Sequence, residues 1–378
     1  MRARFALLPE RTMKKILFLA NHFIILYSFR KELISELLSK GYEVYLSLPQ
    51  NEDNEYFRSL GCKIIETDID RHGVNAVKDG LLIRRYKRII KSVKPDVVLT
   101  YTIKPNVYGG IACKRLKVPY ISNVTGLGSA ISNGGLIKSV ALSLYKISQK
   151  KASMVFFQND ENKDFMVKNR IIKGNYEVLP GSGVNLIENK FEPYPEESGK
   201  TVFVTIGRIM KDKGIDELLL SAKELKEKHD DIAFKLVGGF DDDYKAKIER
   251  AEKEGIIEYV GFTKDVHSAI KNSHATIHPS YHEGTSNVLL ETASCGRPII
   301  ASNVAGCNNT FDDGVSGIAF EPKNAAALTL AVEKFLLLSN EERAEMGRRG
   351  REKMEKEFDR RFVIDAYLRE IEKICKEN

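Results

Sequence analysis

Two glutamates, Glu283 and Glu291, flank the start of a predicted helix whose surroundings suit the binding of a phosphorylated ligand. Residues 275–278 predict a short apolar strand, and the helix begins near Thr285 or Ser286 and runs to a glycine before the next buried strand. Free backbone N–H groups at a helix start and the positive end of the helix dipole attract anions. A phosphate flanked by two carboxylates, which accept hydrogen bonds from hydroxyls, indicates a sugar nucleotide.

Two cations are expected at the same edge of the sheet as Glu283. Gly207-Arg208 and Lys213 lie where the predicted strand 201–206 ends and the next helix begins. Cations at this point can bind a phosphate group through charge-assisted hydrogen bonds. The alternative is that they belong to a solvated basic turn.

The chain alternates short apolar strands with helix-length segments, which predicts an α/β protein of two doubly wound, Rossmann-like domains. A polar stretch rich in proline and glycine interrupts the alternation after residue 180. We therefore expect an extension at 1–12, a first domain at 13–185, a linker at 186–200, a second domain at 201–357 and a C-terminal helix at 358–378 that packs back on the first domain. The strands are expected at 16–20, 43–48, 63–66, 96–101, 120–124 and 154–157 in the first domain, and at 201–206, 233–237, 257–260, 275–278 and 298–301 in the second.

Composition and charge narrow the class of protein. Five scattered cysteines favour a reducing compartment and give no disulfide frame or structural zinc site. The apolar run near residues 16–29 is too short and too interrupted for a membrane anchor. Residues 1–185 carry 30 Lys or Arg against 16 Asp or Glu, whereas residues 186–378 carry 29 against 36. The basic first half predicts an anionic partner.

The order of several short motifs resembles that of retaining family 4 glycosyltransferases of GT-B fold, similar to bacterial capsular-polysaccharide and lipid-linked oligosaccharide enzymes. The resemblance covers residues 13 to 378 and implies two Rossmann-like domains that face each other across a cleft, with no cofactor. The matching motifs are Phe29-Arg30, Thr102-Ile-Lys-Pro-Asn-Val-Tyr-Gly109, Val124-Thr-Gly-Leu-Gly128, Gly181-Ser-Gly-Val184, Gly207-Arg-Ile-Met-Lys-Asp-Lys-Gly214, Val237-Gly-Gly239 and the E-x7-E spacing of Glu283 and Glu291.

The resemblance implies roles for residues on the donor side. Arg208, Lys213 and Glu283 are the expected catalytic residues: the cations stabilise the leaving diphosphate, and Glu283 contacts hydroxyls of the donor sugar. Glu291 is expected at the ribose hydroxyls. The remaining expected donor-binding residues are Gly207, Gly238, Gly239, Phe262, Thr263, Gly284, Thr285, Ser286 and Asn287. Retention of configuration is implied by the family alone, with front-face attack and the leaving phosphate acting as base.

The acceptor side departs from the family pattern. The loop after the fourth strand, where the family often has a histidine near the donor sugar, has none here, so Lys104 and Asn106 are the candidate replacements. Arg30, Thr125, Gly126 and Gly128 complete the expected acceptor-binding set. Basic amphipathic segments at 83–91 and 138–151 would bind anionic headgroups on the cytoplasmic face of the inner membrane and bring a lipid-linked acceptor to the site; alternatively they are solvated basic helix faces.

The expected function is transfer of a hexose or N-acetylhexosamine from a UDP-sugar, and two other functions are possible for this fold and charge. A nucleotide-sugar 2-epimerase shares the fold but needs acid and base groups on the sugar carbons. A non-enzymatic protein that binds nucleotide sugars or nucleic acid is the second alternative, although clustered exposed aromatics and reader motifs for nucleic acid are missing from the sequence. Asp241-Asp-Asp243 is expected to be a solvated turn outside the donor pocket, and His278 and His282 are not spaced for zinc, so no metal is expected.

Overall fold

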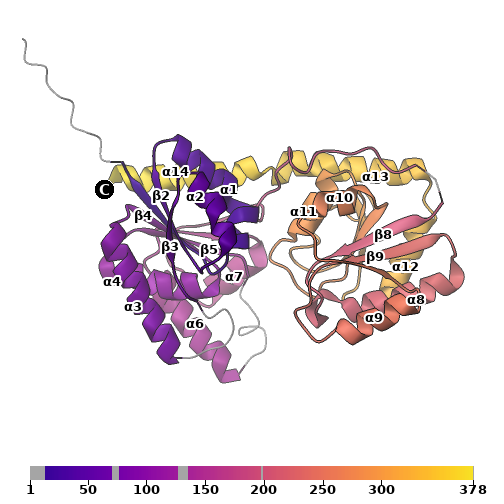
Figure 1. The fold of residues 1–378 in the computed structure, drawn as a ribbon, viewed down its shortest axis with the longest axis horizontal. Helices are drawn as coiled ribbons and strands as arrows, with labels where there is room; N and C mark the ends of the chain where they lie inside the picture. The colour runs from indigo at the N-terminus through magenta and orange to yellow at the C-terminus, as the bar shows by residue number, and fades with distance from the viewer. Residues whose placement is uncertain (1–12, 70–75, 127–134, 197–198, 378) are drawn as a thin grey trace, which may run out of the picture. The chain divides into compact units, whose positions relative to one another are not determined.

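The structure, a computed structural model, describes residues 13–69, 76–126, 135–196 and 199–377. The chain divides into two compact units. Unit 1 comprises Met1–Phe157, Asp164–Glu177 and Ile364–Asn378, and unit 2 comprises Gln158–Lys163 and Val178–Val363. Each unit is built around one parallel sheet (Figure 1).

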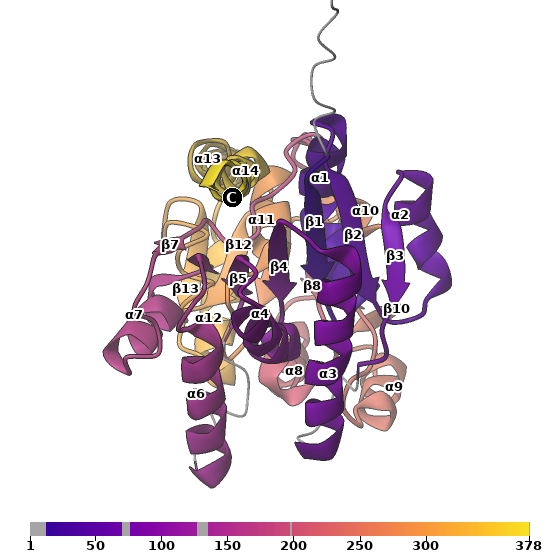
Figure 2. The same cartoon turned by 90° about the vertical axis from the view of Figure 1, so that its left-hand side faces the viewer.

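Unit 1 contains a seven-stranded sheet in the order β3-β2-β1-β4-β5-β6-β7. Its strands are rich in buried apolar and β-branched residues, as expected of a parallel sheet covered on both faces. Helices α3, α4 and α6 pack side by side on one face, and α1 and α14 lie on the other (Figure 2). The elements are β1 (Lys15–Leu19), α1 (Phe23–Ser39), β2 (Glu43–Leu48), η1 (Glu52–Asn54), α2 (Glu55–Ser59), β3 (Lys63–Glu66), α3 (Ala76–Val93), β4 (Val97–Tyr101), η2 (Pro105–Gly109), α4 (Gly110–Leu116), β5 (Tyr120–Val124), α6 (Gly135–Gln149), β6 (Met154–Phe157), α7 (Asp160–Lys168), β7 (Tyr176–Val178) and α14 (Arg360–Glu377).

The C-terminal helix α14 is part of the core of unit 1. The ring of Tyr367 packs against Phe156 at a centroid distance of 4.7 Å and against Tyr101 at 6.2 Å. The guanidinium of Arg30 in α1 lies over both tyrosine rings, at 5.2 Å from Tyr101 and 5.3 Å from Tyr367. A cation held between two buried rings is stabilised by their quadrupoles, so α1, β4 and α14 are fastened to one another.

Unit 2 contains a six-stranded parallel sheet in the order β10-β9-β8-β11-β12-β13. Helices α8, α9 and α12 cover one face, where the ring of Phe203 stacks on Phe234 and meets Phe335 edge to face. Helices α10 and α11 contribute to two further apolar clusters, and α13 packs against α11. The elements are β8 (Thr201–Ile206), η3 (Lys211–Lys213), α8 (Ile215–Lys228), β9 (Ile232–Val237), α9 (Lys245–Lys253), β10 (Glu258–Gly261), α10 (Val266–Lys271), β11 (Ala275–His278), α11 (Asn287–Ser294), β12 (Ile299–Ser302), β13 (Gly317–Phe320), α12 (Ala325–Leu336), α13 (Asn340–Lys353) and η4 (Met354–Phe358).

The segment expected to be a linker, 186–200, is held firmly against unit 2 where the structure describes it. The buried guanidinium of Arg297 donates hydrogen bonds to the carbonyl oxygens of Glu192 at 2.9 Å and Pro193 at 2.8 Å. The hydroxyl of Tyr194 donates to the carbonyl of His274 at 3.0 Å. Residues 186–196 therefore pack on unit 2, because Arg297 satisfies the backbone that a polar, proline-containing sequence would otherwise leave to water.

Helix α1 begins at Phe23, directly after a capping histidine. The side chain of His22 accepts a hydrogen bond from the Ile24 amide at 3.1 Å and caps the helix. Histidine is an uncommon capping residue, so this helix start is hard to predict from the sequence. Among the described helices, none combines the length and hydropathy that crossing a membrane requires.

Candidate active site

The candidate site lies at the carboxyl ends of β8 and β11 in unit 2. These strands are neighbours in the sheet, but the chain continues from β8 toward β9 on one side and from β11 toward β12 on the other. Open parallel sheets bind ligands at such a switch point, outside the carboxyl ends of the strands. Gly207-Arg208 directly follows β8, and the loop that carries Glu283 follows β11.

Glu283 is the centre of a charged network. Its carboxylate forms an ion pair with Lys213, and its Oε1 lies 3.0 Å from Nε2 of His278. His278 is buried, and its Nε2 also lies 3.1 Å from Oγ of Ser286. Burial alone would raise the pKa of Glu283, but the hydrogen bond from His278 and the charge of Lys213 hold its pKa well below its usual range. Glu283 is therefore a carboxylate that accepts hydrogen bonds and not a proton donor.

Arg208 and Lys213 converge on one small space. A cavity of about 10 Å³ is lined by both residues together with Gly207, His278 and Ser280. The volume is about that of a single water molecule. The hydroxyl oxygen of Ser280 is buried there without a hydrogen-bond partner among the described residues. The structure thus brings together the two cations, the Glu283 network and an available hydroxyl.

The acidic turn after β9 lies next to this space. Asp241 forms an ion pair with Arg208, and a carboxylate oxygen of Asp242 accepts a hydrogen bond from the Lys211 amide at 3.0 Å. The three aspartates are exposed, as expected of a solvated turn. Their expected position away from the donor residues is wrong, because Asp241 contacts one of the two cations directly.

Three hydrogen bonds to neighbouring segments fix the residues at the start of helix α11. The Ser286 amide donates to the Gly306 carbonyl at 2.8 Å, Thr285 Oγ1 donates to the Gln158 carbonyl at 2.8 Å, and Asn159 donates to the Gly284 carbonyl. Thr285 and Ser286 are buried, so they position the loop and leave the first helix amides for a ligand.

Two side chains of α11 are available to accept or donate hydrogen bonds. Asn287 has a buried side-chain oxygen without a partner among the described residues. Glu291 is half-buried and receives no hydrogen bond at its carboxylate from the described part of the chain. Burial raises the pKa of Glu291 to about 7, despite the attraction of Arg360. The expected contact of Glu291 with the ribose hydroxyls stays a prediction.

Glycine is required at Gly238 because the chain passes so close to itself there. A Cβ atom at Gly238 would lie 1.7 Å from the carbonyl oxygen of Gly207, whereas one at Gly239 would meet nothing within 4 Å. The strand ends that carry Gly207 and Gly238 are also joined by a hydrogen bond from the Gly207 amide to Val237 at 3.0 Å. Phe262 lies exposed just beyond β10, and Thr263 Oγ1 accepts from the Asp265 amide at 3.0 Å.

The expected acceptor residues lie in unit 1 and differ in accessibility. Arg30 is 2 % exposed and Asn106 is 1 % exposed, so neither side chain reaches solvent. The amide of Asn106 donates to the Asn123 carbonyl at 2.7 Å and accepts from Thr100 Oγ1 at 2.7 Å. Direct acceptor contact by these two side chains is therefore contradicted, because Arg30 and Asn106 bind their own sheet and its covering helices.

The other expected acceptor residues follow adjacent strands. Lys104 comes after β4 and forms an ion pair with the buried Asp79 at 3.4 Å. Thr125 and Gly126 follow β5 and are half-buried. Gly128 lies outside the described residues. Lys104, Thr125 and Gly126 therefore remain the candidates on this side.

Sequence reasoning missed three contributors to the site. His278, considered only as a zinc ligand, instead donates to Glu283; Ser280 lines the small cavity; and Asn159 supports Gly284 from 125 positions away. His278 and Ser280 lie within the motif that drew attention to the site, so their proximity was a usable signal. Asn159 could be found only from the fold.

Two family models match this chain. "Glycosyl transferase 4-like" matches residues 15–159, and "Glycosyl transferases group 1" matches residues 187–353. A Campylobacter jejuni protein, N,N'-diacetylbacillosaminyl-diphospho-undecaprenol alpha-1,3-N-acetylgalactosaminyltransferase, is 28% identical over 96% of this chain and 99% of its own. The Staphylococcus aureus capsular polysaccharide biosynthesis glycosyltransferase CapM is 25% identical over 83% and 88%.

Solved structures agree with the fold. Anabaena HepE in complex with UDP-glucose superposes with a TM-score of 0.75 at 16% identity, and the match covers 96% of this chain and 100% of that protein. The two family models together cover most of the chain, in the same order as in the expected family. The chain therefore belongs to the glycosyltransferases of GT-B fold, with a 4-like domain followed by a group 1 domain.

Proposed function

We propose that this glycosyltransferase moves a hexose or N-acetylhexosamine from a UDP-sugar to a saccharide carried on a polyprenyl diphosphate, with retention of configuration and without a metal ion. The observation that carries the proposal is the convergence of Arg208 and Lys213 beside the Glu283–His278 pair at the switch point of unit 2. The names of the Campylobacter relative and of the HepE complex support the acceptor and donor classes.

The chemistry follows from the charges. As the bond between the sugar C1 and the β-phosphate oxygen breaks, its electron pair stays on that oxygen, and the diphosphate becomes more negative. Arg208 and Lys213 would stabilise this charge more strongly in the transition state than in the bound donor. Lys213 has three N–H donors, so it can keep its contact with Glu283 while it donates to a phosphate oxygen.

Glu283 would hold the sugar in place during this step. Its low pKa keeps it ionised, and His278 fixes one of its oxygens, so the remaining lone pairs can accept from hydroxyls of the donor sugar. The acceptor hydroxyl would bond to C1 on the face that the phosphate leaves, and its proton would pass to the departing phosphate oxygen. This route needs no covalent intermediate with the chain.

The proposal also places the enzyme on the cytoplasmic face of the inner membrane. Helix α3 exposes Arg84, Arg88 and Lys91 beside Leu81, which is 55 % exposed, and α6 exposes Val140 and Ile147 near Lys146. Cationic helices with exposed apolar side chains bind anionic lipid surfaces. Such a surface would meet the lipid part of the acceptor.

Transfer with defined substrates tests the proposal. The protein is incubated with a panel of UDP-sugars and short prenyl-diphosphate saccharides, with and without EDTA, and products are identified by mass and by the anomeric coupling constant. We expect acceptor-dependent transfer that is retained in EDTA and that gives the anomer of the donor. Conversion of the UDP-sugar without acceptor into its 2-epimer, or loss of activity in EDTA, would contradict the proposal.

A further inference from the structure

Tyr281 connects the two segments of unit 2 that carry Lys213 and Glu283. It lies two residues before Glu283 in the loop after β11, whereas Lys213 ends the turn η3 that precedes α8. Tyr281 does not itself line the small cavity that Arg208 and Lys213 share. Its contacts are therefore with the segments that hold the site and not with the space inside the site.

The backbones of these two segments are in direct contact. The Tyr281 amide donates a hydrogen bond at 2.9 Å to the carbonyl of Asp212, the residue before Lys213. Gly214, the residue after Lys213, has a φ of +68°, and a Cβ atom there would overlap the carbonyl oxygen of Pro279. The loop after β11 thus contacts the residues on both sides of Lys213.

The side chain of Tyr281 adds a contact with helix α8. Its hydroxyl lies 2.8 Å and 2.9 Å from the two carboxylate oxygens of Glu217, in the first turn of α8, and donates to them. Burial, together with the hydrogen bond to Glu217, raises the pKa of Tyr281, so the hydroxyl keeps its proton. Hydrogen bonds to a charged acceptor are stronger than those between neutral groups. This contact therefore ties the start of α8 to the loop after β11.

The ring of Tyr281 is held by a third segment. Nζ of Lys323, in the connection between β13 and α12, lies 4.9 Å from the centre of the ring. A cation at this distance is attracted to the ring face. The amide, the hydroxyl and the ring of Tyr281 are thus each bound by a different part of unit 2, which leaves the side chain little freedom to move.

These contacts determine where Lys213 lies relative to Glu283. The two residues form an ion pair, and Tyr281 is bound to the residue before Lys213, to the helix after it and, along its own chain, to Glu283. A displacement of about 1 Å in a group that acts on the reacting atoms can lower a rate on the order of 100-fold. A small movement of the turn before α8 would therefore affect the chemical step.

We infer that Tyr281 is a positioning residue, which through Glu217 holds the Lys213 ammonium beside Glu283 and at the leaving diphosphate. The inference rests on the proposed function and extends it to a residue that touches neither the donor nor the acceptor. It predicts that the Tyr281 hydroxyl contributes to the rate of transfer and not to the binding of the donor.

Removal of the hydrogen bond from either side forms the first test. Tyr281→Phe keeps the ring beside Lys323 and loses the hydroxyl, and Glu217→Ala removes the acceptor of the same bond. We expect each variant to lower kcat about tenfold, because Lys213 is less well placed, with the donor KM within about threefold of the native value. A native kcat in either variant would overturn the inference.

Tyr244→Phe is the matched control for the loss of a hydroxyl. Tyr244 donates to Asp216, the neighbour of Glu217 in the same turn of α8, at 3.0 Å. It belongs to the connection between β9 and α9 and not to the loop that carries Glu283. We expect a near-native kcat in Tyr244→Phe, and a fall equal to that of Tyr281→Phe would overturn the inference.

Combination with Lys213→Ala distinguishes positioning from a general loss of packing. If Tyr281 acts through Lys213, adding Tyr281→Phe to the Lys213→Ala protein should change kcat less than about twofold. A residue that only stabilised the fold would lower kcat by the same factor whether or not Lys213 is present. The measurement is kcat of the unaltered protein, the two single variants and the double variant at saturating UDP-sugar and acceptor. Equal factors in the two backgrounds would overturn the inference.

The two proposals fail in different ways. If the unaltered protein transfers no sugar to any lipid-linked acceptor, the proposed function fails. If it transfers sugar and Lys213→Ala lowers kcat, while Tyr281→Phe keeps a native kcat, the positioning role of Tyr281 alone fails.

Discussion

At the scale of single residues, the carboxylates of the E-x7-E pair differ in their ionisation. The pKa of Glu283 lies well below its usual range, whereas burial raises the pKa of Glu291 to about 7. Glu283 is therefore charged throughout the physiological range, and Glu291 changes charge within it. The different surroundings of the two glutamates therefore give them different pKa values.

Glu291 should make donor binding depend on pH. A carboxylate accepts hydrogen bonds from ribose hydroxyls better than a carboxylic acid does, so the donor KM should fall as the pH rises through about 7. Glu291→Gln should remove this dependence and weaken the donor about tenfold at pH 8. Donor KM values between pH 5.5 and 8.5 check both statements, and a pH profile shared by the two proteins would contradict this role.

The raised pKa of Glu291 also lowers the free energy of unfolding at high pH. The pKa of Glu291 is higher in the folded protein than in the unfolded chain, so its contribution to stability is fully present below the unfolded value and is lost as the pH rises through about 7. Glu291→Gln should raise the free energy of unfolding by on the order of 1 kcal/mol at pH 8 and change it little at pH 4. Denaturant unfolding at both pH values measures the difference. Equal effects at pH 4 and pH 8 would show that Glu291 is not shifted.

The sequence predicted which residues on the donor side lie together better than it predicted the exposure of the residues on the acceptor side. Arg208, Lys213 and Glu283 are close in space because each follows a strand at one sheet edge, a relation that strand order makes visible in the sequence. Arg30 and Asn106 were misplaced because their polarity suggested exposure, whereas Arg30 is held between two tyrosine rings and Asn106 bonds to buried strand residues. The residues that contact Arg30 and Asn106 come from distant segments of the chain, so no local sequence pattern reveals that these two side chains are buried.

At the scale of elements, the bounds of most strands were predicted closely. The segments that connect them were predicted less accurately. Buried apolar runs identified β2, β5, β6, β8 and β11, whose bounds match expectation. The edge strands β7 and β13 were not predicted; they are short and only partly buried. The helix start at Phe23 and the attachment of residues 186–196 depend on His22 and Arg297, which act through specific hydrogen bonds and not through a periodic pattern.

The contact between the ends of β8 and β9 predicts opposite outcomes for two adjacent glycines. Gly238→Ala should lower the free energy of unfolding by about 2 kcal/mol or more, since its Cβ would overlap the Gly207 carbonyl and displace the turn that precedes Arg208. Gly239→Ala should leave stability within about 0.5 kcal/mol, since that Cβ meets open space. Denaturant unfolding measures both. Equal losses in the two variants would contradict the close approach.

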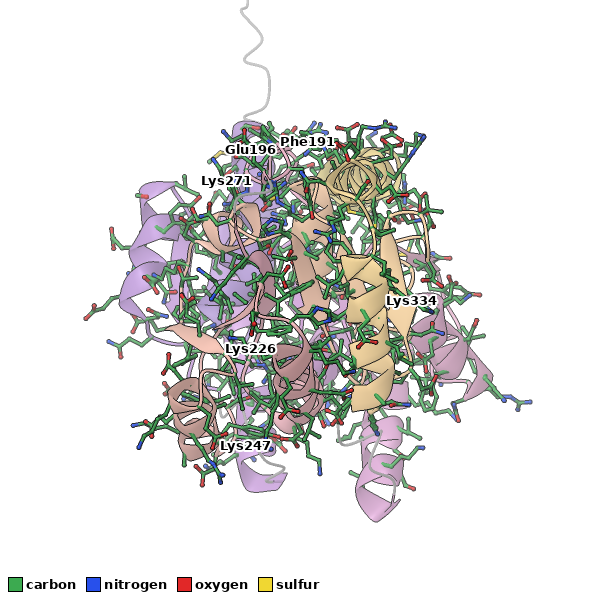
Figure 3. The ribbon with its side chains drawn as sticks, turned by 90° about the vertical axis from the view of Figure 1, so that its right-hand side faces the viewer. Phe191, Glu196, Lys226, Lys247, Lys271 and Lys334 are labelled. Atoms are coloured by element: carbon green, nitrogen blue, oxygen red, sulfur yellow. The ribbon has the colours of Figure 1, made fainter. Side chains whose placement is uncertain are left out.

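At the scale of the whole molecule, the basic half is expected to act as a surface for anionic lipid. Helix α3 presents Arg84, Arg88 and Lys91 to solvent, and unit 2 has exposed lysines of its own, such as Lys334 on the outside of α12 (Figure 3). Exposed apolar side chains accompany the cations in both units: Leu81 is 55 % exposed on α3, and Leu330 on α12 is 58 % exposed.

Reversing the charges on α3 tests whether anionic lipid binds to this helix in particular or to any cation of the protein. Changing Arg84, Arg88 and Lys91 together to Glu should weaken binding to vesicles that contain anionic lipid by at least tenfold, at about 1 kcal/mol for each cation near the surface. The matched control reverses Lys223, Lys253 and Lys334 in unit 2, which changes the net charge equally. Vesicle co-sedimentation compares them, and equal losses from the two triple variants would contradict a specific membrane surface on α3.

We propose that Lys213, together with Arg208, stabilises the leaving diphosphate beside Glu283. This role is tested by kcat of Lys213→Ala for sugar transfer in EDTA, with Lys211→Ala on the same turn as the control. We expect kcat to fall on the order of 10²- to 10³-fold for Lys213→Ala, with near-native kcat for Lys211→Ala and an unchanged fold by circular dichroism. A kcat of Lys213→Ala within about threefold of the unaltered protein would show that Lys213 does not stabilise the leaving group.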